Sequence, residues 1–192
     1  VGNYLTEAML WLYGIAGPIY VPVMAALFPL LVITGMHTSF IPFTTERFAT
    51  VGYDPFLGVP QVIANINQGV ACLVVALKTK NVDLKSVAST SGITAMVAGT
   101  TEPALFGITL KYKTPLIAAM IGSFCGGIWG GINGCVRYAY GGNSLLTLPV
   151  FIGEIPSNFI NVVISVIIGM AATFIATMIL YKPEKAETSA ES

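Results

Sequence analysis

Charged side chains are scarce in this sequence. Of its 192 residues, 9% are Asp, Glu, Lys or Arg and 55% are hydrophobic, and the mean hydropathy is +0.79. A soluble domain carries about 25% charged residues, so this composition excludes an ordinary soluble protein and predicts a membrane protein. The formal net charge is zero, and nothing in it indicates nucleic-acid binding.

Residues that carry metal or redox chemistry are also few. The chain has one histidine, His37, and three cysteines, Cys72, Cys125 and Cys135. The cysteines lie in apolar runs without the spacing of a metal or redox motif, so we interpret them as small buried hydrophobic residues. No metal ion or cofactor is expected. The chain begins at Val1 without a basic signal segment, which suggests a fragment or one part of a larger chain.

Long apolar runs are abundant instead. A helix that crosses a membrane needs about 20 mostly apolar residues. Prolines interrupt the first run and predict a kinked or broken helix there. Two connecting segments are polar and turn-rich, so residues 44–58 are expected to form an exposed loop and 137–157 a turn followed by a part-apolar loop. The predicted spans cover about residues 17–36, 59–77, 114–136 and 158–181.

A further apolar segment, residues 86–110, is interrupted by Glu102 and Pro103. Because a residue before proline is steered away from the helical region, we expect Glu102 to lie outside a helix. The parts on either side, 86–98 and 104–110, are each too short to cross about 30 Å as helices. The segment is therefore predicted to be a re-entrant hairpin. The fold class is an all-α polytopic membrane protein, with about four transmembrane helices plus this hairpin.

The distribution of basic residues supports the hairpin. If residues 86–110 enter and leave on the same side, seven of the nine basic residues share one side of the membrane. The positive-inside rule makes that side cytoplasmic. A full crossing would move Lys111 and Lys113 outward, so the charges favour a hairpin that brings Glu102 into the protein from the cytoplasm. The seven residues are Lys78, Lys80, Lys85, Lys111, Lys113, Lys182 and Lys185, and the other two are Arg47 and Arg137.

Several polar groups inside the apolar segments are candidates for binding. His37 is either a packed residue that caps a helix end or a substrate ligand at membrane depth. Asn65, Asn67 and Gln68 are costly in lipid, so they should face protein or a water-filled cavity. Hydrogen bonding between helices is the structural interpretation of these amides, and a role in substrate binding is the functional one.

Glycines form a regular pattern within residues 114–136. A spacing of four places them on one helix face, where a second helix can approach closely. We interpret this pattern as helix packing. The glycines of the first row are Gly122, Gly126, Gly130 and Gly134, and Gly127 and Gly131 form a neighbouring row.

The residues around Glu102 and Pro103 resemble the signature of a known family. Residues 99–107, Gly-Thr-Thr-Glu-Pro-Ala-Leu-Phe-Gly, resemble the Gly-Ile-Thr-Glu-Pro signature of the enzyme IIC permeases of the bacterial phosphotransferase system (PTS). The similarity is to the glucose superfamily, and within it to the β-glucoside, sucrose and trehalose branch. Gly35-Met36-His37 and residues 65–69 agree with that branch, while Thr100 replaces the usual isoleucine. The resemblance implies that residues 1–181 are the C-terminal half of a IIC domain. The small, charged end of the chain predicts that 182–192 are a disordered cytoplasmic tail or truncated linker.

This resemblance implies a sugar permease in the bacterial plasma (inner) membrane. Such a permease binds an external sugar, here a β-glucoside or related disaccharide, and carries it inward by alternating access while it is phosphorylated. The phosphate comes from a phosphocysteine on a IIB domain, so IIB and IIA domains are the expected partners, fused or separate, and a homodimer is expected. No IIB domain is expected within this chain, because its cysteines lack the surroundings that lower a thiol pKa. The chain would act as the membrane subunit of a sugar phosphotransferase.

By the same resemblance, Glu102 and His37 bind the sugar, and Thr101, Asn65, Asn67 and Gln68 are weaker candidates. A carboxylate accepts charge-assisted hydrogen bonds from hydroxyl groups. Glu102 is also the catalytic candidate, as a general base for the attacking hydroxyl. Two alternatives stay open: an ion-coupled secondary transporter with Glu102 as its proton carrier, and a membrane scaffold or sensor that transports nothing.

Overall fold

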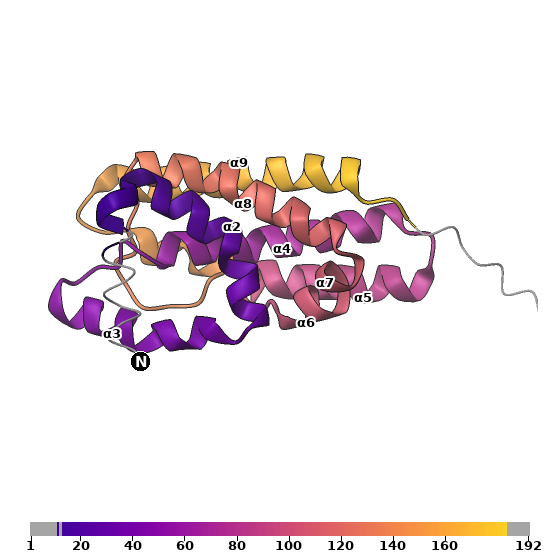
Figure 1. Ribbon diagram of the computed structural model, residues 1–192, viewed down its shortest axis with the longest axis horizontal. Helices are drawn as coiled ribbons and strands as arrows, with labels where there is room; N and C mark the ends of the chain where they lie inside the picture. The colour runs from indigo at the N-terminus through magenta and orange to yellow at the C-terminus, as the bar shows by residue number, and fades with distance from the viewer. Residues whose placement is uncertain (1–10, 12, 184–192) are drawn as a thin grey trace, which may run out of the picture.

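The computed structural model describes residues 11 and 13–183, and all regular elements within this range are helical (Figure 1). Short 3-10 and π segments connect the α-helices. In chain order the elements are η1 Gly17–Ile19, α2 Tyr20–Ile33, η2 Met36–Phe40, α3 Ile41–Thr50, α4 Gly58–Lys78, α5 Val82–Val97, α6 Glu102–Ala104, the π turn η3 Leu105–Thr109, α7 Leu110–Tyr112, α8 Thr114–Ile132, η4 Leu145–Phe151 and α9 Pro156–Leu180.

Four helical segments are long and apolar enough to cross a membrane. They confirm the predicted spans and the prediction of an all-α polytopic membrane protein. The first begins earlier than expected, at Tyr13. It accommodates Pro18 in the first turn of η1, where its missing N–H costs little. It ends before Gly35, which has a φ of 71°. The four segments are Tyr13–Ile33, Gly58–Lys78, Thr114–Ile132 and Pro156–Leu180.

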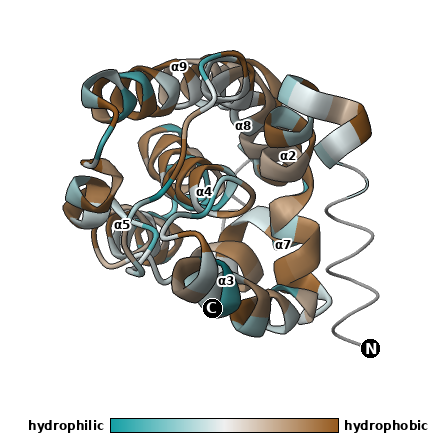
Figure 2. Ribbon diagram, turned by 90° about the vertical axis from the view of Figure 1, so that its left-hand side faces the viewer, coloured by the Kyte–Doolittle hydropathy of each residue, from teal (hydrophilic) through white to brown (hydrophobic). Residues whose placement is uncertain are grey.

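Helix α4 lies at the centre of the bundle and contacts α2, α5, α8 and α9 (Figure 2). Of the most apolar 18-residue stretch of α4, 89% is buried inside the structure, whereas for α9 the share is only 33%. The outer side of α9 exposes Ile160, Ile167 and Ile175. Lipid tails are as apolar as these side chains, so such a surface suits contact with the bilayer.

The glycines within α8 serve helix packing, as predicted, but Gly134 lies beyond the end of α8 and a Cβ there would meet nothing within 4 Å. A Cβ on Gly126 would lie 2.5 Å from the carbonyl oxygen of Ser165 in α9. A Cβ on Gly127, in the neighbouring row, would lie 2.5 Å from the Cα of Pro22 in α2. Each row therefore accommodates a different neighbour of α8. The contact with α9 also contains a hydrogen bond of 2.5 Å from Ser165 Oγ to the Gly126 carbonyl oxygen.

Replacement of Gly126 by alanine is expected to lower stability by about 1–3 kcal/mol, the usual cost of overpacking. The added methyl group would meet backbone atoms of α9, which cannot rotate away. The apparent melting temperature in detergent would measure this loss. Gly14→Ala is the matched control, because its Cβ would meet nothing within 4 Å. Equal melting temperatures for the two variants would contradict the packing role.

The predicted hairpin is present as a helical hairpin. The chain turns after α5 at Gly99, which has a φ of 77°, and α6, η3 and α7 return along α5. The expectation that Glu102 lies outside a helix is wrong, because Glu102 is the first residue of α6. The break falls one step earlier, at residues 99–101, and Pro103 occupies the first turn of α6, where proline is tolerated.

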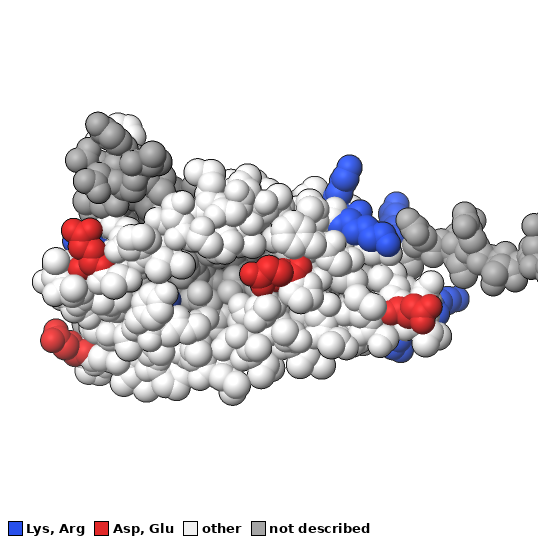
Figure 3. Space-filling model, turned by 90° about the horizontal axis from the view of Figure 1, so that it is seen from below, with Lys and Arg blue, Asp and Glu red and all other residues white. Residues whose placement is uncertain are grey.

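The ends of the hairpin lie with the other lysine-bearing ends. One cleft is lined by Lys78, Lys80, Leu84 and Lys111, together with Tyr181 and Pro183, which follow α9. Blue side chains accordingly gather at one end of the molecule in Figure 3. This arrangement agrees with entry and return on the same side. Lys185 and most of the predicted tail lie outside the described residues.

The segment 44–58 differs from the expected exposed loop. Its first part belongs to α3, which extends to Thr50. Asp54, Phe56 and Leu57 are almost completely buried. Phe56 and Leu57 pack in the hydrophobic core. Asp54 contacts Arg137 in the loop after α8, and that contact forms one side of the site described below.

Candidate functional site

A cavity of about 200 Å³ lies where the hairpin turn meets elements from the opposite end of the bundle. The hairpin contributes its turn, α2 and η2 contribute one wall, and α4 and residues 137–143 contribute another. Its polar lining consists of His37, Thr44, Gln61, Asn65, Thr101, Glu102, Arg137, Tyr140 and Asn143, and its apolar lining includes Phe28, Val32, Phe40 and Ile41.

The hairpin turn is held in place from two sides. Asn65 Nδ2 in α4 donates a hydrogen bond of 3.2 Å to the carbonyl oxygen of Gly99. On the other side, a Cβ on Gly99 would lie 3.1 Å from the carbonyl oxygen of Asn143. Thr101, which is buried, and Glu102, which is exposed, follow directly after this turn. The turn therefore fixes the direction in which the Glu102 carboxylate enters the cavity.

Glu102 has a free carboxylate within the described part of the chain. No Lys, Arg or His nitrogen there lies within the 4.0 Å of an ion pair with it. Its position at the start of α6 adds favourable backbone N–H dipoles, although α6 is short. The carboxylate oxygens therefore have acceptor capacity left for a ligand with hydroxyl groups.

His37 enters the cavity from the other wall. Gly35 adopts the left-handed conformation and starts the 3-10 turn η2, which carries His37. The imidazole is half-buried, and its Nδ1 atom is buried without a hydrogen-bond partner among the described residues. A buried polar atom of this kind costs free energy unless it is satisfied, so the geometry favours a polar ligand beside His37.

The two remaining predicted residues do not reach this cavity. Asn67 Nδ2 donates a hydrogen bond of 3.1 Å to Ser123 Oγ in α8. Gln68 Oε1 accepts one of 2.8 Å from Thr109 Oγ1 in the returning arm of the hairpin. Of the six predicted site residues, the structure thus brings His37, Asn65, Thr101 and Glu102 together. The partners of the other two amides favour the structural interpretation, in which polar groups join helices.

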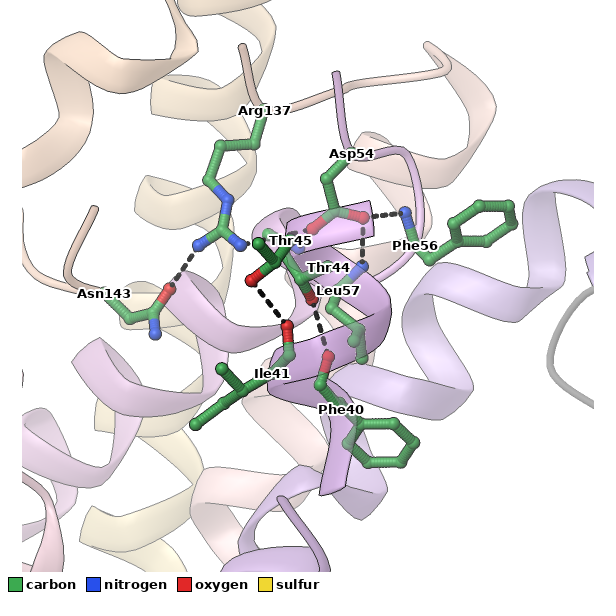
Figure 4. A network of polar contacts seen from close by, with 10 residues as sticks. Phe40, Ile41, Thr44, Thr45, Asp54, Phe56, Leu57, Arg137 and Asn143 are labelled. Carbon is green, nitrogen blue, oxygen red and sulfur yellow. Dashed lines mark hydrogen bonds and ion pairs between the residues drawn. The ribbon is translucent and has the colours of Figure 1, made fainter. Parts of the chain in front are cut away.

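A buried ion pair forms the base of the opposite wall (Figure 4). Arg137 Nη2 lies 3.2 Å from Asp54 Oδ2, and the side chains are 2% and 0% exposed. The two residues also exchange backbone hydrogen bonds of 2.8 and 2.9 Å. Arg137 Nη1 donates a further bond of 3.2 Å to Asn143 Oδ1. These contacts join residue 54 to the loop that follows α8.

Asp54 also caps the start of α4. Its carboxylate accepts hydrogen bonds of 2.8, 3.1 and 2.9 Å from the backbone N–H groups of Phe56, Leu57 and Gly58. Such a carboxylate stabilises the positive end of a helix. Gly58 leaves space for the arginine, because a Cβ there would lie 2.6 Å from Arg137 Cβ.

Burial lowers the pKa of the Arg137 guanidinium, and the negative charge of Asp54 opposes that shift. An arginine stays protonated at neutral pH even when buried. The guanidinium of Arg137 is therefore a buried cation, and among the described residues the Asp54 carboxylate compensates its charge.

Five further lining residues were not predicted from the sequence: Arg137, Tyr140, Asn143, Gln61 and Thr44. The sequence marks only Arg137 weakly, because it is one of two basic residues outside the lysine-rich side. Its partner Asp54 lies 83 residues away in the chain, and no local pattern links the two. Gln61 sits one turn before Asn65 on α4, which marks it only once the face of α4 is known.

The cysteines do not take part in this site. Cys135 is buried and its burial raises the thiol pKa to about 11, so little thiolate forms near neutral pH. Cys72 is buried in α4 and contacts the carbonyl oxygen of Ala104 at 3.6 Å. Their interpretation as small buried residues agrees with these two positions, whereas Cys125 in α8 is only partly buried.

Comparisons with known proteins point to one group. The family model "Phosphotransferase system, EIIC" matches residues 1–123. The PTS system beta-glucoside-specific EIIBCA component of Bacillus subtilis (strain 168) is 37% identical over 181 residues, which are 94% of this chain and 29% of the relative. The PTS system arbutin-, cellobiose-, and salicin-specific EIIBC component of Escherichia coli (strain K12) is 32% identical over 181 residues, 94% of this chain and 37% of the relative.

A sucrose-specific EIIBC component of Bacillus subtilis (strain 168) is also similar, with 32% identity over 183 residues, 94% of this chain and 39% of the relative. The chain thus spans about a third of the length of the curated relatives it matches. No solved structure matches it.

Proposed function

The chain belongs to the EIIC family of the phosphotransferase system, and from this premise we propose that it forms the sugar-binding part of a phosphoenolpyruvate-dependent sugar permease. Its family and its apolar helices make it a multi-pass protein of the bacterial plasma membrane. The permease binds a β-glucoside or a related disaccharide and delivers it to the cytoplasm as the phosphorylated sugar.

The observation that carries this proposal is the meeting of Glu102 and His37 in one cavity. The two residues are far apart in sequence and come from opposite walls. Glu102 presents a carboxylate without an ion pair among the described residues, and His37 presents an unpartnered buried nitrogen. Both can accept hydrogen bonds from hydroxyl groups, which a sugar supplies in several directions. Asn65 and Thr101 add neutral polar groups beside them.

The proposed phosphoryl transfer at this site is a nucleophilic displacement at phosphorus. The sugar hydroxyl oxygen attacks the phosphorus of a phosphocysteine on a IIB domain. The new O–P bond forms as the S–P bond breaks, and the cysteine leaves as a thiolate. Glu102 accepts the proton of the attacking hydroxyl, as a general base. The chain is in this sense the membrane subunit of a sugar phosphotransferase.

The names of the relatives support the substrate class and the partners. Those reported above carry IIB and IIC components in one chain, and one carries IIA as well. Their names state β-glucosides, arbutin, cellobiose, salicin or sucrose. We therefore propose IIB and IIA domains as the phosphoryl donors and a two-ring glucoside as the substrate. A homodimer in the lipid bilayer stays a prediction from the family resemblance.

Uptake into vesicles tests the proposal. Vesicles that contain the natural-length protein should accumulate phosphorylated glucoside when phosphoenolpyruvate and the soluble phosphocarrier proteins are supplied. A proton gradient alone should drive no accumulation, because the energy comes from the transferred phosphoryl group. Accumulation of free sugar under a proton gradient, without phosphoenolpyruvate, would overturn the proposal in favour of the ion-coupled transporter. That alternative is not favoured by family membership.

A further inference from the structure

The sides of the cavity differ in chemistry. The hairpin turn with Glu102 and the η2 wall with His37 offer hydrogen-bond acceptors that have no partners among the described residues. On the wall formed by residues 137–143, the guanidinium of Arg137 already donates to Asp54 and Asn143. That wall therefore has fewer polar groups free for a ligand. Its exposed surface is aromatic, because Tyr140 lines the cavity and is 61% exposed.

Tyr140 is held in place by neighbours that leave much of its ring free. The Arg137 guanidinium carbon lies over the Tyr140 ring at 5.9 Å from its centroid, and over the Phe48 ring at 5.6 Å. The two rings also contact each other edge to face, with centroids 6.2 Å apart. Arg137 in turn is fixed by the buried pair with Asp54. A ring anchored by cation–π and edge contacts is preorganised for a flat partner.

We propose that Tyr140 forms a subsite for the aglycone ring of a β-glucoside, with Arg137 as its buried support. This inference rests on the proposed function and deepens it. The hydroxyl-rich glucosyl ring binds at the acceptors of Glu102 and His37. The second ring, which presents an apolar face, packs on the exposed aromatic ring of Tyr140. Tyr140 is thus a specificity-determining residue and takes no part in phosphoryl transfer.

Comparison of two glucosides isolates this subsite. Phenyl β-D-glucoside has a flat aglycone ring, whereas methyl β-D-glucoside has none. For Tyr140→Ala, the concentration of phenyl glucoside that gives half-maximal phosphorylation should rise about three- to tenfold, the size of one aromatic contact. The value for methyl glucoside should change less than about twofold by the same reasoning, which also shows that the variant is folded. Tyr140→Phe should retain the preference, because the ring is kept.

Tyr53→Ala is the matched control. Tyr53 is also an exposed tyrosine with an aromatic neighbour, Tyr138 at 6.4 Å, but it does not line the cavity. Tyr53→Ala should leave the half-maximal concentrations of both glucosides unchanged. Equal losses for the two glucosides in Tyr140→Ala, or no loss for either, would overturn the subsite. Failure of the wild-type protein to use either glucoside would instead overturn the proposed function, whatever the behaviour of Tyr140.

Discussion

Replacement of Glu102 by glutamine is expected to abolish phosphorylation-coupled sugar uptake while the protein remains inserted in the membrane. Glutamine has nearly the same shape but has no negative charge and cannot accept the proton of the attacking hydroxyl. Loss of a hydrogen bond to a charged group costs about 1.5–3 kcal/mol, and loss of a general base slows a reaction about 10²–10⁴-fold. Initial rates of phosphoenolpyruvate-dependent uptake should therefore fall at least about a hundredfold.

The control for this variant is Glu154→Gln. Glu154 is also an exposed glutamate, but it lies before α9 and does not line the cavity. It should leave uptake unchanged. If Glu102→Gln transported and phosphorylated sugar at the wild-type rate, the carboxylate would have neither the binding nor the catalytic role assigned to it.

The second large effect is expected at Asp54. Asp54→Asn should destabilise the protein by about 3–5 kcal/mol, because it leaves the buried Arg137 cation without its counter-charge. The asparagine oxygen can still accept some of the hydrogen bonds from the start of α4, so the lost charge is the main change. The expected readout is a fall of roughly 6–20 °C in the apparent melting temperature in detergent.

A double variant separates the ion pair from other effects. Asp54→Asn combined with Arg137→Met removes both charges and should be more stable than Asp54→Asn alone, since no unpaired charge remains buried. Glu46→Gln, at an exposed position of α3, is the surface control and should change stability little. A melting temperature of Asp54→Asn equal to that of the wild-type protein would show that the pair is not a structural support.

The spans and the hairpin were predictable because their signals are local or additive. Hydropathy over about 20 residues marks a span, and all four predicted spans are present. The hairpin followed from the shortness of the segments around Glu102 and from the placement of lysines. The helix contacts of α8 were predictable in the same way, because the glycine spacing is a local pattern. Gly126 and Gly127 indeed face different neighbouring helices.

The rule for residues before proline disfavours the helical region without forbidding it. Glu102 begins α6 with Pro103 in the first turn, where the missing N–H of proline costs little. The turn instead uses Gly99, with its positive φ. Only the position of the break changed, and the carboxylate still follows the turn directly.

The second wall of the site was not predictable from sequence. Its central contact joins Asp54 to Arg137 across 83 residues, and segment 44–58 looked like an exposed loop because it is polar. The polarity is real, but it is satisfied internally by the ion pair and by the cap of α4. Likewise, the amides of Asn67 and Gln68 could not be assigned to helix contacts before their partners Ser123 and Thr109 were known.

The central claim is that the hairpin brings Glu102 into a cavity where it holds a sugar. Equilibrium binding of radiolabelled phenyl β-D-glucoside to membranes, without any phosphoryl donor, tests it most directly. The wild-type protein should bind the glucoside saturably, and Glu102→Gln should weaken binding at least about tenfold, as expected for a lost charge-assisted hydrogen bond. Wild-type affinity in the Glu102→Gln variant would contradict the claim.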